Sequence, residues 1–309
     1  MSHSLYATHN IPAAGSVRFV QSYAKINLTL DVLGKRGDGY HELVTIMQTI
    51  DLYDTICLTV TEDDHVRIVC TQTELSNDDN LALRAAQAIR HHLGLTTGLL
   101  IELQKRIPVA AGLGGGSSNA AAVLLALQQW WQLPCTPADL LTLAAALGSD
   151  VPFFLTGGLA LCEGRGERVT PLTARWPGDM RWLLLVKPAI GVSTALIFRT
   201  LPASDYSDGR ASRRASAALQ TLSGLGADDL HNGLERGVLE RYPQVAQTRE
   251  DILRAGATLV RLSGSGPTLF APFADLTHAA HVQQQLQAQE YETYLTRAVP
   301  REDEEITFF

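Results

Sequence analysis

The stretch Pro108-Val-Ala-Ala-Gly-Leu-Gly-Gly-Gly-Ser-Ser-Asn119 decides how the chain is organised. Four of its glycines fall within five positions, and an apolar run from Ala120 to Leu127 follows directly. Glycine lets the backbone turn through positive φ and leaves amide N–H groups open to a ligand. A helix that starts at about Ser117 has unpaired N–H groups and partial positive charge at that end. A serine-capped tight turn would explain a single glycine pair, but the full stretch predicts a phosphate-binding loop.

Three familiar phosphate loops do not match this stretch. A Walker A loop needs a lysine directly after its last glycine, where this chain has Ser117 and Ser118. The dinucleotide fingerprint needs glycine or alanine three positions after Gly114, and Ser117 stands there. The protein-kinase loop needs a following valine and a later His-Arg-Asp segment, and the sequence has neither. The residues alone therefore predict a phosphate loop of another kind.

Length and composition are those of a globular protein. A chain of 309 residues with 46% hydrophobic and 18% charged residues is long enough for two lobes. The net charge of −7 argues against binding of nucleic acid through bulk electrostatics. The cysteines are widely spaced, without a C-x-x-C pair, and we expect free thiols in a reducing compartment: Cys57, Cys70, Cys135 and Cys162.

The sequence carries no targeting or membrane signal. No apolar run approaches the roughly 18 residues that span a bilayer. The first sixteen residues, a loose leader, lack the basic start and apolar centre of a secretory signal. We therefore expect a soluble, cytoplasmic protein that binds neither membrane nor nucleic acid.

Hydrophobic periodicity predicts an α+β chain. Antiparallel strands are expected at Val17–Val20, Ile26–Val32, Leu43–Ile50, Thr55–Val60 and Val66–Cys70. Helices are expected at Leu81–His92 between Asn80 and Gly94, from Ser117 to Leu133, and from Thr136-Pro137 to Leu147.

The second half of the chain shows the same mixture. Trp176–Asp179 is a candidate linker, Trp182–Val186 a strand, and Ser193 or Thr194 caps a helix through Phe198. The segment Ala203–Arg214 is polar and expected to be mobile. Further helices are expected at Ala215–Leu222, Asp228–Leu239, Val245–Ala255 and Leu276–Ala288, with strands at Leu99–Leu103, Gly157–Cys162, Ala257–Leu262, Thr268–Ala271 and Tyr291–Ala298. An acidic tail, Arg301–Glu305, is expected to be solvated.

A few polar residues could carry chemistry, although none is convincing alone. Lys25 and Asn27 alternate with Ile26 and Leu28, a pattern that favours a solvent-exposed strand face. Asp150 follows a helix on a turn, where aspartate is commonly a capping residue. A second glycine turn, Leu262-Ser-Gly-Ser-Gly-Pro267, fits either a hairpin loop or a second cradle for phosphate.

Taken together, Ala24–Leu28, Pro108–Ser118 and Leu262–Pro267 resemble the GHMP kinase superfamily in their order and spacing. The resemblance implies an S5-like N-terminal lobe over residues 1–178 and a ferredoxin-like C-terminal lobe over residues 179–309. It also implies ATP and Mg²⁺ as cofactors, with the metal ligands left open and the site in the cleft between the lobes.

Lys35–Glu42, Asp79–Leu81 and Leu147–Pro152 are similar to one branch of that superfamily. That branch phosphorylates the C2 hydroxyl of a cytidine-diphosphate-linked methylerythritol, in the non-mevalonate route to isoprenoids. By position, Asp150 matches the catalytic base and Lys25 the catalytic lysine. The implied substrate-binding residues are Asn27, Tyr40, His41, Thr194, Phe198, Gly264, Ser265 and Gly266, with Tyr40 and Phe198 stacking on the cytosine.

The implied ATP-binding residues are Asn80, Lys105, Pro108, Val109, Ala110, Ala111, Gly112, Leu113, Gly114, Gly115, Gly116, Ser117 and Ser118. We expect a small-molecule kinase that is a monomer or a homodimer. Two alternatives remain: a mevalonate- or homoserine-type GHMP kinase, and a non-catalytic nucleotide-binding regulator on the same fold.

Overall fold

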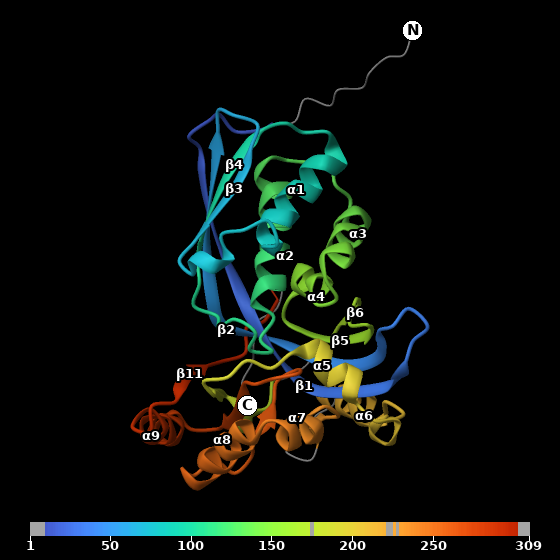
Figure 1. Cartoon of the computed structure of the whole chain (residues 1–309), viewed down its shortest axis with the longest axis vertical. Helices are drawn as coiled ribbons and strands as arrows, with labels where there is room; N and C mark the ends of the chain where they lie inside the picture. The colour runs from blue at the N-terminus through green and yellow to red at the C-terminus, as the bar shows by residue number, and fades with distance from the viewer. Residues whose placement is uncertain (1–9, 174–175, 221–224, 227–228, 302–309) are drawn as a thin grey trace. The chain divides into compact units, whose positions relative to one another are not determined.

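The computed structural model describes residues 10–173, 176–220, 225–226 and 229–301, and Figure 1 labels its elements. The chain divides into two compact units. The first contains Met1–Ser22, Asp54–Arg106 and Gly116–Leu155, and the second contains Tyr23–Tyr53, Ile107–Gly115 and Thr156–Phe309. The expected lobe boundary at residue 178 stays a prediction.

The sheet of the first unit has the strand order β3-β4-β2-β1. Its strands are β1 (Val17–Lys35), β2 (His41–Thr61), β3 (Val66–Cys70) and β4 (Gly98–Gln104). Strand β4 pairs antiparallel with β2 and parallel with β3. The expectation of antiparallel strands throughout is therefore wrong at β3. Helix α1 lies between β3 and β4 in the chain and returns it to the same end of the sheet, as parallel pairing requires.

Strands β1 and β2 each join two segments that we expected as separate strands. Neither junction contains glycine or proline, so nothing forces the chain to turn. Each strand begins in one unit and ends in the other.

The helices of the first unit are α1 (Leu81–Leu93), α2 (Gly115–Trp130), α3 (Pro137–Leu147) and α4 (Val151–Thr156), with a short 3₁₀ turn at Thr73–Leu75. Of these, α1 and α3 begin at the expected N-cap residues, whereas α2 begins at Gly115, before the expected Ser117. The Asn80 side chain accepts from the Ala82 N–H, and Gly94 ends α1 in the left-handed conformation. Thr136 and Asp139 form a capping box at the start of α3.

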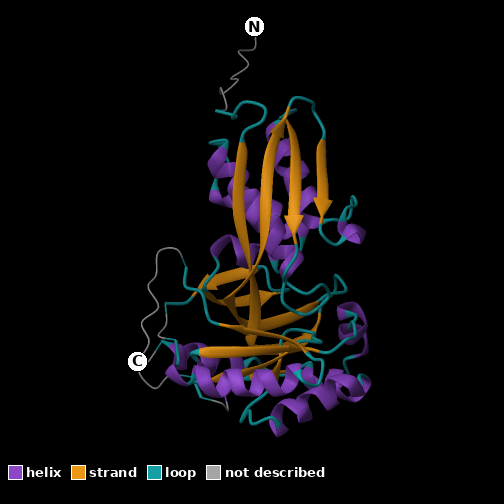
Figure 2. Cartoon of the chain, turned by 90° about the vertical axis from the view of Figure 1, so that its left-hand side faces the viewer, coloured by secondary structure: helices purple, strands orange, loops and turns teal. Residues whose placement is uncertain are grey.

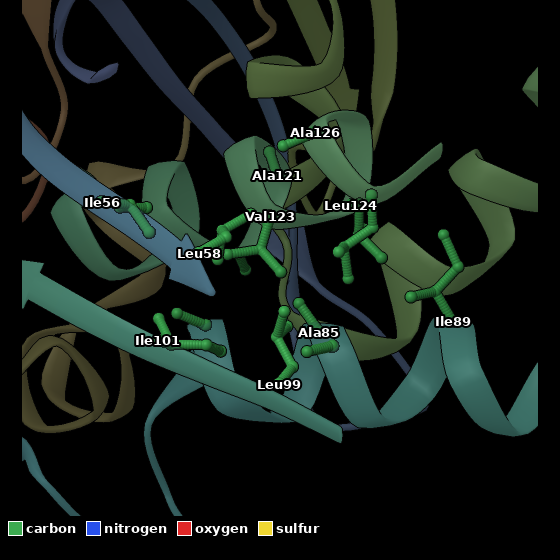
Figure 3. Close-up of a cluster of buried hydrophobic side chains, with 14 of the residues drawn as sticks. Ile56, Leu58, Ala85, Ile89, Leu99, Ile101, Ala121, Val123, Leu124 and Ala126 are labelled. Carbon is green, nitrogen blue, oxygen red and sulfur yellow. The ribbon is translucent and has the colours of Figure 1, made fainter. Parts of the chain in front are cut away.

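Helices α1 and α2 pack on one face of this sheet (Figure 2), and the apolar side chains between them form the core shown in Figure 3. Ile56 and Leu58 of β2 and Ile101 of β4 face Val123 and Leu124 of α2 in this cluster. Burying one such side chain contributes roughly 1.5–3 kcal/mol. The core therefore fixes α2 on the sheet.

The second unit contains two groups of strands. Strand β5 (Leu159–Gly164) pairs with β2 and with β6 (Arg168–Pro171), while β8 (His231–Asn232) pairs with β1. A four-stranded antiparallel sheet has the order β11-β7-β10-β9, with β7 (Trp182–Lys187), β9 (Arg261–Leu262), β10 (Leu269–Phe273) and β11 (Glu292–Thr296).

The helices of the second unit are α5 (Thr194–Thr200), α6 (Arg210–Leu219), α7 (Glu235–Arg241), α8 (Pro243–Arg254) and α9 (Leu276–Gln287). Short 3₁₀ turns lie at Gly178–Met180 and Ala203–Asp205. Helices α8 and α9 contact each other and the four-stranded sheet (Figure 2). Trp176, in the expected linker, is buried and donates from Nε1 to the Met180 carbonyl.

The segment Ala203–Arg214 is ordered, contrary to the expectation of mobility. Helix α6 begins at Arg210, because the buried Asp31 carboxylate accepts from the Ser212 N–H and from the Ser207 hydroxyl. A carboxylate at this end stabilises the helix through the unpaired N–H groups.

Two expected elements of the second unit are shorter than predicted. The helix expected from Asp228 begins at Glu235 instead, since β8 pairs with β1 before it, and the strand Ala257–Leu262 shrinks to β9. The ends of two predicted helices, at 221–222 and 228, lie outside the described residues, as do residues 1–9 of the leader and 302–305 of the tail.

Within the part of the chain that the structure describes, no helix combines the length and apolar character needed to cross a bilayer.

Candidate functional site

The predicted site residues divide between the two units. Asn80, Lys105, Gly116, Ser117, Ser118 and Asp150 belong to the first unit. Lys25, Asn27, Tyr40, His41, residues 108–115, Thr194, Phe198 and the turn 264–266 belong to the second. A joint role of Lys25 and Asp150 therefore stays a prediction.

The glycine loop needs glycine for its backbone and for its packing. Gly112 and Gly114 have φ values of 76° and 71°. A Cβ built on Gly112 would lie 2.3 Å from the Ser263 carbonyl oxygen, a distance that no side chain could occupy. The Ser263 hydroxyl also donates to the Gly112 carbonyl at 3.1 Å. The loop and the second glycine turn, which joins β9 to β10 as a hairpin, therefore pack directly on each other.

Lys25 and Asn27 are buried, so the solvent-exposed face that their alternation favoured is wrong. Only 3% of Lys25 and 2% of Asn27 are exposed. The apolar face of this part of β1 faces a core of the second unit, and the polar face is covered as well. The Lys25 N–H donates to the Leu113 carbonyl at 3.0 Å, which joins β1 to the glycine loop.

A chain of buried hydrogen bonds leads away from the Lys25 ammonium group. Lys25 Nζ donates to Asn27 Oδ1 at 2.6 Å, and Asn27 Nδ2 donates to Thr45 Oγ1 at 2.8 Å. Thr45 Oγ1 in turn donates to the Thr29 carbonyl at 2.6 Å. A buried ammonium group is costly unless oxygen acceptors surround it, and Asn27 supplies one.

The second glycine turn lies beside this ammonium group. A Cβ built on Gly264 would be 3.1 Å from Asn27 Oδ1 and 3.4 Å from Lys25 Nζ. Ser193 caps α5 through the Leu196 N–H, and the Thr194 hydroxyl shares a 2.6 Å hydrogen bond with the Ser265 hydroxyl. The second unit therefore brings together Lys25, Asn27, Thr194 and both glycine segments.

An aromatic group forms around His41. The His41 ring lies 5.3 Å from the Phe198 ring and 6.0 Å from the Tyr206 ring. Tyr40 is 52% exposed, and the Arg165 guanidinium lies 4.7 Å from its ring centre. Sequence reasoning missed Tyr206 and Arg165. Tyr206 falls in the polar segment that we expected to be mobile, although it is the aromatic residue of that segment.

In the first unit, the start of α2 lies near the ends of other helices. A Cβ built on Gly148 would lie 4.0 Å from Ser117 Oγ, and one built on Gly116 would lie 3.6 Å from Leu81, the first residue of α1. Asp150 is half-buried on the turn between α3 and α4, as expected. The structure thus groups the turn of Asp150, the N-terminus of α2 and the N-cap Asn80, whose side chain is engaged in capping.

Lys105 forms a buried ion pair. Its Nζ lies 2.5 Å from Asp54 Oδ2, with 3% of the lysine side chain and none of the aspartate side chain exposed. Asp54 also accepts from the Arg106 N–H at 2.7 Å and from Asn119 Nδ2 at 2.9 Å. Asp54 and Asn119 were missed because the residues that they contact lie far away in the sequence. Asp54 therefore holds both Lys105 and the first turns of α2.

Among residues 10–173, 176–220, 225–226 and 229–301, no group of three or more His, Cys, Asp or Glu side chains is arranged to hold a metal ion. Ser118 is buried at the start of α2, and Ser117 is half-buried.

Two family models match the chain. "GHMP kinases N terminal domain" matches residues 80–158, and "GHMP kinases C terminal" matches residues 213–292. The first match contains the glycine loop and Asp150.

Individual proteins are similar over nearly the whole chain. The 4-diphosphocytidyl-2-C-methyl-D-erythritol kinase of Alkaliphilus metalliredigens is 42% identical over 289 residues, which cover 91% of this chain and 97% of that protein. A crystal structure of 4-(cytidine 5'-diphospho)-2C-methyl-D-erythritol kinase superimposes with a TM-score of 0.75 at 32% identity, covering 91% of this chain and 99% of that one. Homoserine kinase from Cytophaga hutchinsonii superimposes with a TM-score of 0.67 at 21% identity, covering 90% and 95%, which shows a shared fold.

The first prediction concerns Asp54. We expect Asp54→Ala to lower the free energy of unfolding by about 3–5 kcal/mol, because it leaves the Lys105 ammonium group buried without its carboxylate. Asp63→Ala, which removes the exposed pair with Arg67, is the matched control and should cost much less, because water screens that pair. Urea denaturation measures both. Equal losses in the two variants would contradict a structural role for the buried pair.

The second prediction concerns His41. Burial lowers the pKa of His41 from its usual value of 6.5, and the nearby charge of Lys35 lowers it further. As the pH falls through about 6.5, the unfolded chain binds a proton at this residue before the folded chain does, so the free energy of unfolding decreases. In His41→Gln, the part of the decrease in the free energy of unfolding that comes from His41 should disappear. Above pH 7.5, plots of this free energy against pH should run parallel for the variant and the wild type. Curves that stay parallel down to pH 5.5 would contradict the lowered pKa.

Proposed function

The chain belongs to the GHMP kinase family, and we propose that it transfers the γ-phosphoryl group of ATP to the C2 hydroxyl of 4-diphosphocytidyl-2-C-methyl-D-erythritol. The observation that carries this proposal is 42% identity over 97% of the length of a relative with that name. The 32% identical crystal structure of the same kinase supports it. Such a reaction belongs to non-mevalonate isoprenoid precursor synthesis.

The reaction requires a base, and we assign that role to Asp150. A tertiary alcohol keeps its proton at neutral pH, so a carboxylate within hydrogen-bond reach must accept the proton as attack on phosphorus proceeds. Asp150 fits because its turn is held between two helices and its side chain is half-buried rather than fully covered.

Lys25 is assigned the stabilisation of negative charge. Phosphoryl transfer depends mainly on positioning and charge neutralisation by donors that are already aimed. The buried position of Lys25, beside both glycine segments, supports this role.

The glycine loop and the start of α2 are assigned to the ATP phosphates. Their backbone N–H groups and the helix dipole favour an anion, and the positive φ of Gly112 and Gly114 keeps the loop free of Cβ atoms. We assign Asn80 to the adenosine. We assign Lys105 to ATP binding through its buried pair with Asp54, which also holds Asn119 of α2. When bound, Mg²⁺ would neutralise phosphate charge, and Ser117 or Ser118 are the side chains of α2 suited to assist in holding it.

The aromatic group around His41 is assigned to the cytidine. Stacking of one aromatic ring on a base contributes roughly 1–3 kcal/mol. Tyr40 is exposed enough to stack, and the lowered pKa of His41 favours a neutral ring that can both donate and accept hydrogen bonds. Binding of the cytidine would then position the distant hydroxyl.

The third prediction tests the substrate. Coupled detection of ADP with ATP, Mg²⁺ and 4-diphosphocytidyl-2-C-methyl-D-erythritol should show turnover, and CMP should inhibit it competitively against that substrate. Mevalonate or homoserine should give no turnover, since neither carries a base for the aromatic group. Turnover of either compound without CMP inhibition would favour the alternative kinases. ATP binding without any ADP production would favour a regulator.

The fourth prediction tests the base. Asp150→Asn should lower kcat by about 100-fold or more, because the amide cannot accept the hydroxyl proton in the same way. The Kd for ATP, measured by calorimetry, should stay within about threefold, since Asp150 is not assigned to the phosphates. Asp179→Asn is a control outside the predicted site. A kcat within twofold of wild type would remove Asp150 from the mechanism.

A further inference from the structure

Thr45 is the last side chain of the hydrogen-bond chain that begins at Lys25. It lies near the start of β2, is 0% exposed, and belongs to the second unit together with Lys25, Asn27 and Thr29. For each hydrogen bond in this series, the chemistry of the groups decides which one donates and which one accepts.

The hydrogen bond between Thr45 and the Thr29 carbonyl has only one possible donor. The Thr29 carbonyl oxygen lies 2.6 Å from Thr45 Oγ1 and can only accept. The Thr45 hydroxyl has a single proton, and this bond uses it. The Ile46 N–H donates to the Thr29 hydroxyl at 3.2 Å, so side chains of β1 and β2 satisfy backbone groups of the facing strand here. Towards Asn27, Thr45 can therefore only accept.

The role of Thr45 as an acceptor determines how the Asn27 side-chain amide is oriented. Its amide nitrogen and oxygen have similar shapes, and the hydrogen-bond partners decide which end lies where. Since Thr45 can only accept, Asn27 Nδ2 faces it at 2.8 Å, and Asn27 Oδ1 faces Lys25 Nζ at 2.6 Å. The reversed amide would place its NH₂ group against the ammonium group and its oxygen against a hydroxyl whose proton is already used. That reversal would lose both hydrogen bonds.

We propose that Thr45 is a positioning residue for phosphoryl transfer. Its hydroxyl accepts from the nitrogen end of the Asn27 amide and so holds the amide in place, and the amide oxygen accepts from the Lys25 ammonium group and helps to aim it. The inference rests on the proposed function, in which Lys25 stabilises the charge on the transferred group. A donor acts on that charge only when it is already aimed. Without the Thr45 hydroxyl, the nitrogen end of the Asn27 amide loses its acceptor, and the amide oxygen is held less firmly against the ammonium group.

The kinetic test compares three variants. Thr45→Val keeps the shape and removes the hydroxyl, and kcat should fall on the order of 10- to 100-fold while both KM values stay within about threefold. Thr45→Ser keeps the hydroxyl and should stay within about threefold of wild type. Thr49→Val is the matched control on the same strand, because the buried Thr49 hydroxyl has no hydrogen-bond partner among the described residues. A slow Thr45→Ser, an equally slow Thr49→Val or an unchanged Thr45→Val would each overturn the proposal.

A double-mutant cycle separates positioning from general structural damage. In a chain that already carries Lys25→Ala, Thr45→Val should lower the residual kcat by no more than about twofold, since the group that it positions is gone. A full additional loss in that background would show that Thr45 acts independently of Lys25 and would overturn the proposal. Circular dichroism checks that each variant is folded. If Thr45→Val does not fold, Thr45→Ala replaces it in both experiments with the same expected outcomes.

A spectroscopic measurement distinguishes failure of this inference from failure of the proposed function. The chain has four lysines, Lys25, Lys35, Lys105 and Lys187, so a spectrum of ¹³Cε-labelled lysine has few signals, and Lys25→Ala identifies that of Lys25. The Lys25 signal should move in Thr45→Val and keep its wild-type position in Thr45→Ser and Thr49→Val. This outcome in a protein without turnover would reject the proposed function and keep the positioning of Lys25. An unmoved signal in Thr45→Val would reject the positioning, whatever the turnover.

Discussion

The Lys25 ammonium group is buried, and this constraint explains which polar groups lie around it. An ion in a strand covered on both faces loses its water and needs acceptors that cannot move away. Asn27 supplies an amide oxygen as the acceptor. Thr45 accepts a hydrogen bond from the amide nitrogen and donates its own proton to the Thr29 carbonyl. One charge thus accounts for two buried polar side chains, Asn27 and Thr45, in a region where apolar side chains would pack more easily.

Close backbone packing is the second constraint, and it depends on glycine residues, which have no Cβ atom. Gly112 and the Ser263 carbonyl approach each other so closely that a single Cβ would collide. Gly264 approaches Asn27 and Lys25 less closely, since a Cβ there would lie 3.1 Å from Asn27 Oδ1 and 3.4 Å from Lys25 Nζ. Glycine at these positions serves two purposes, because it allows the left-handed backbone and also lets two loops pack without side chains between them. The same absence of side chains keeps amide groups open to an anion.

Local signals in the sequence predicted the parts of the fold that depend on near neighbours. The N-caps Asn80 and Thr136 and the positive φ of the glycine loop each depend on a few neighbouring residues, and the structure confirms them. The exposure of Lys25 was predicted wrongly because alternation reports two faces without saying what covers them. Thr45 and Asn27 are 18 positions apart, and Asp54 and Asn119 are 65 apart, so no local pattern could pair them. The family resemblance named roles for many residues, but the partners that hold those residues came from the structure.

The division of the chain has a consequence for how the protein is made. Each compact unit is assembled from three separate segments, and the second unit combines Tyr23–Tyr53 with residues from Thr156 onward. The first unit can close once Leu155 has left the ribosome, whereas early strand residues of the second must wait for later partners such as β8, which pairs with β1. Contacts of such long sequence separation form slowly. During synthesis the nascent chain therefore carries a completed core together with apolar strand segments between Tyr23 and Tyr53 that still lack partners, and those segments are the ones most in need of protection from aggregation.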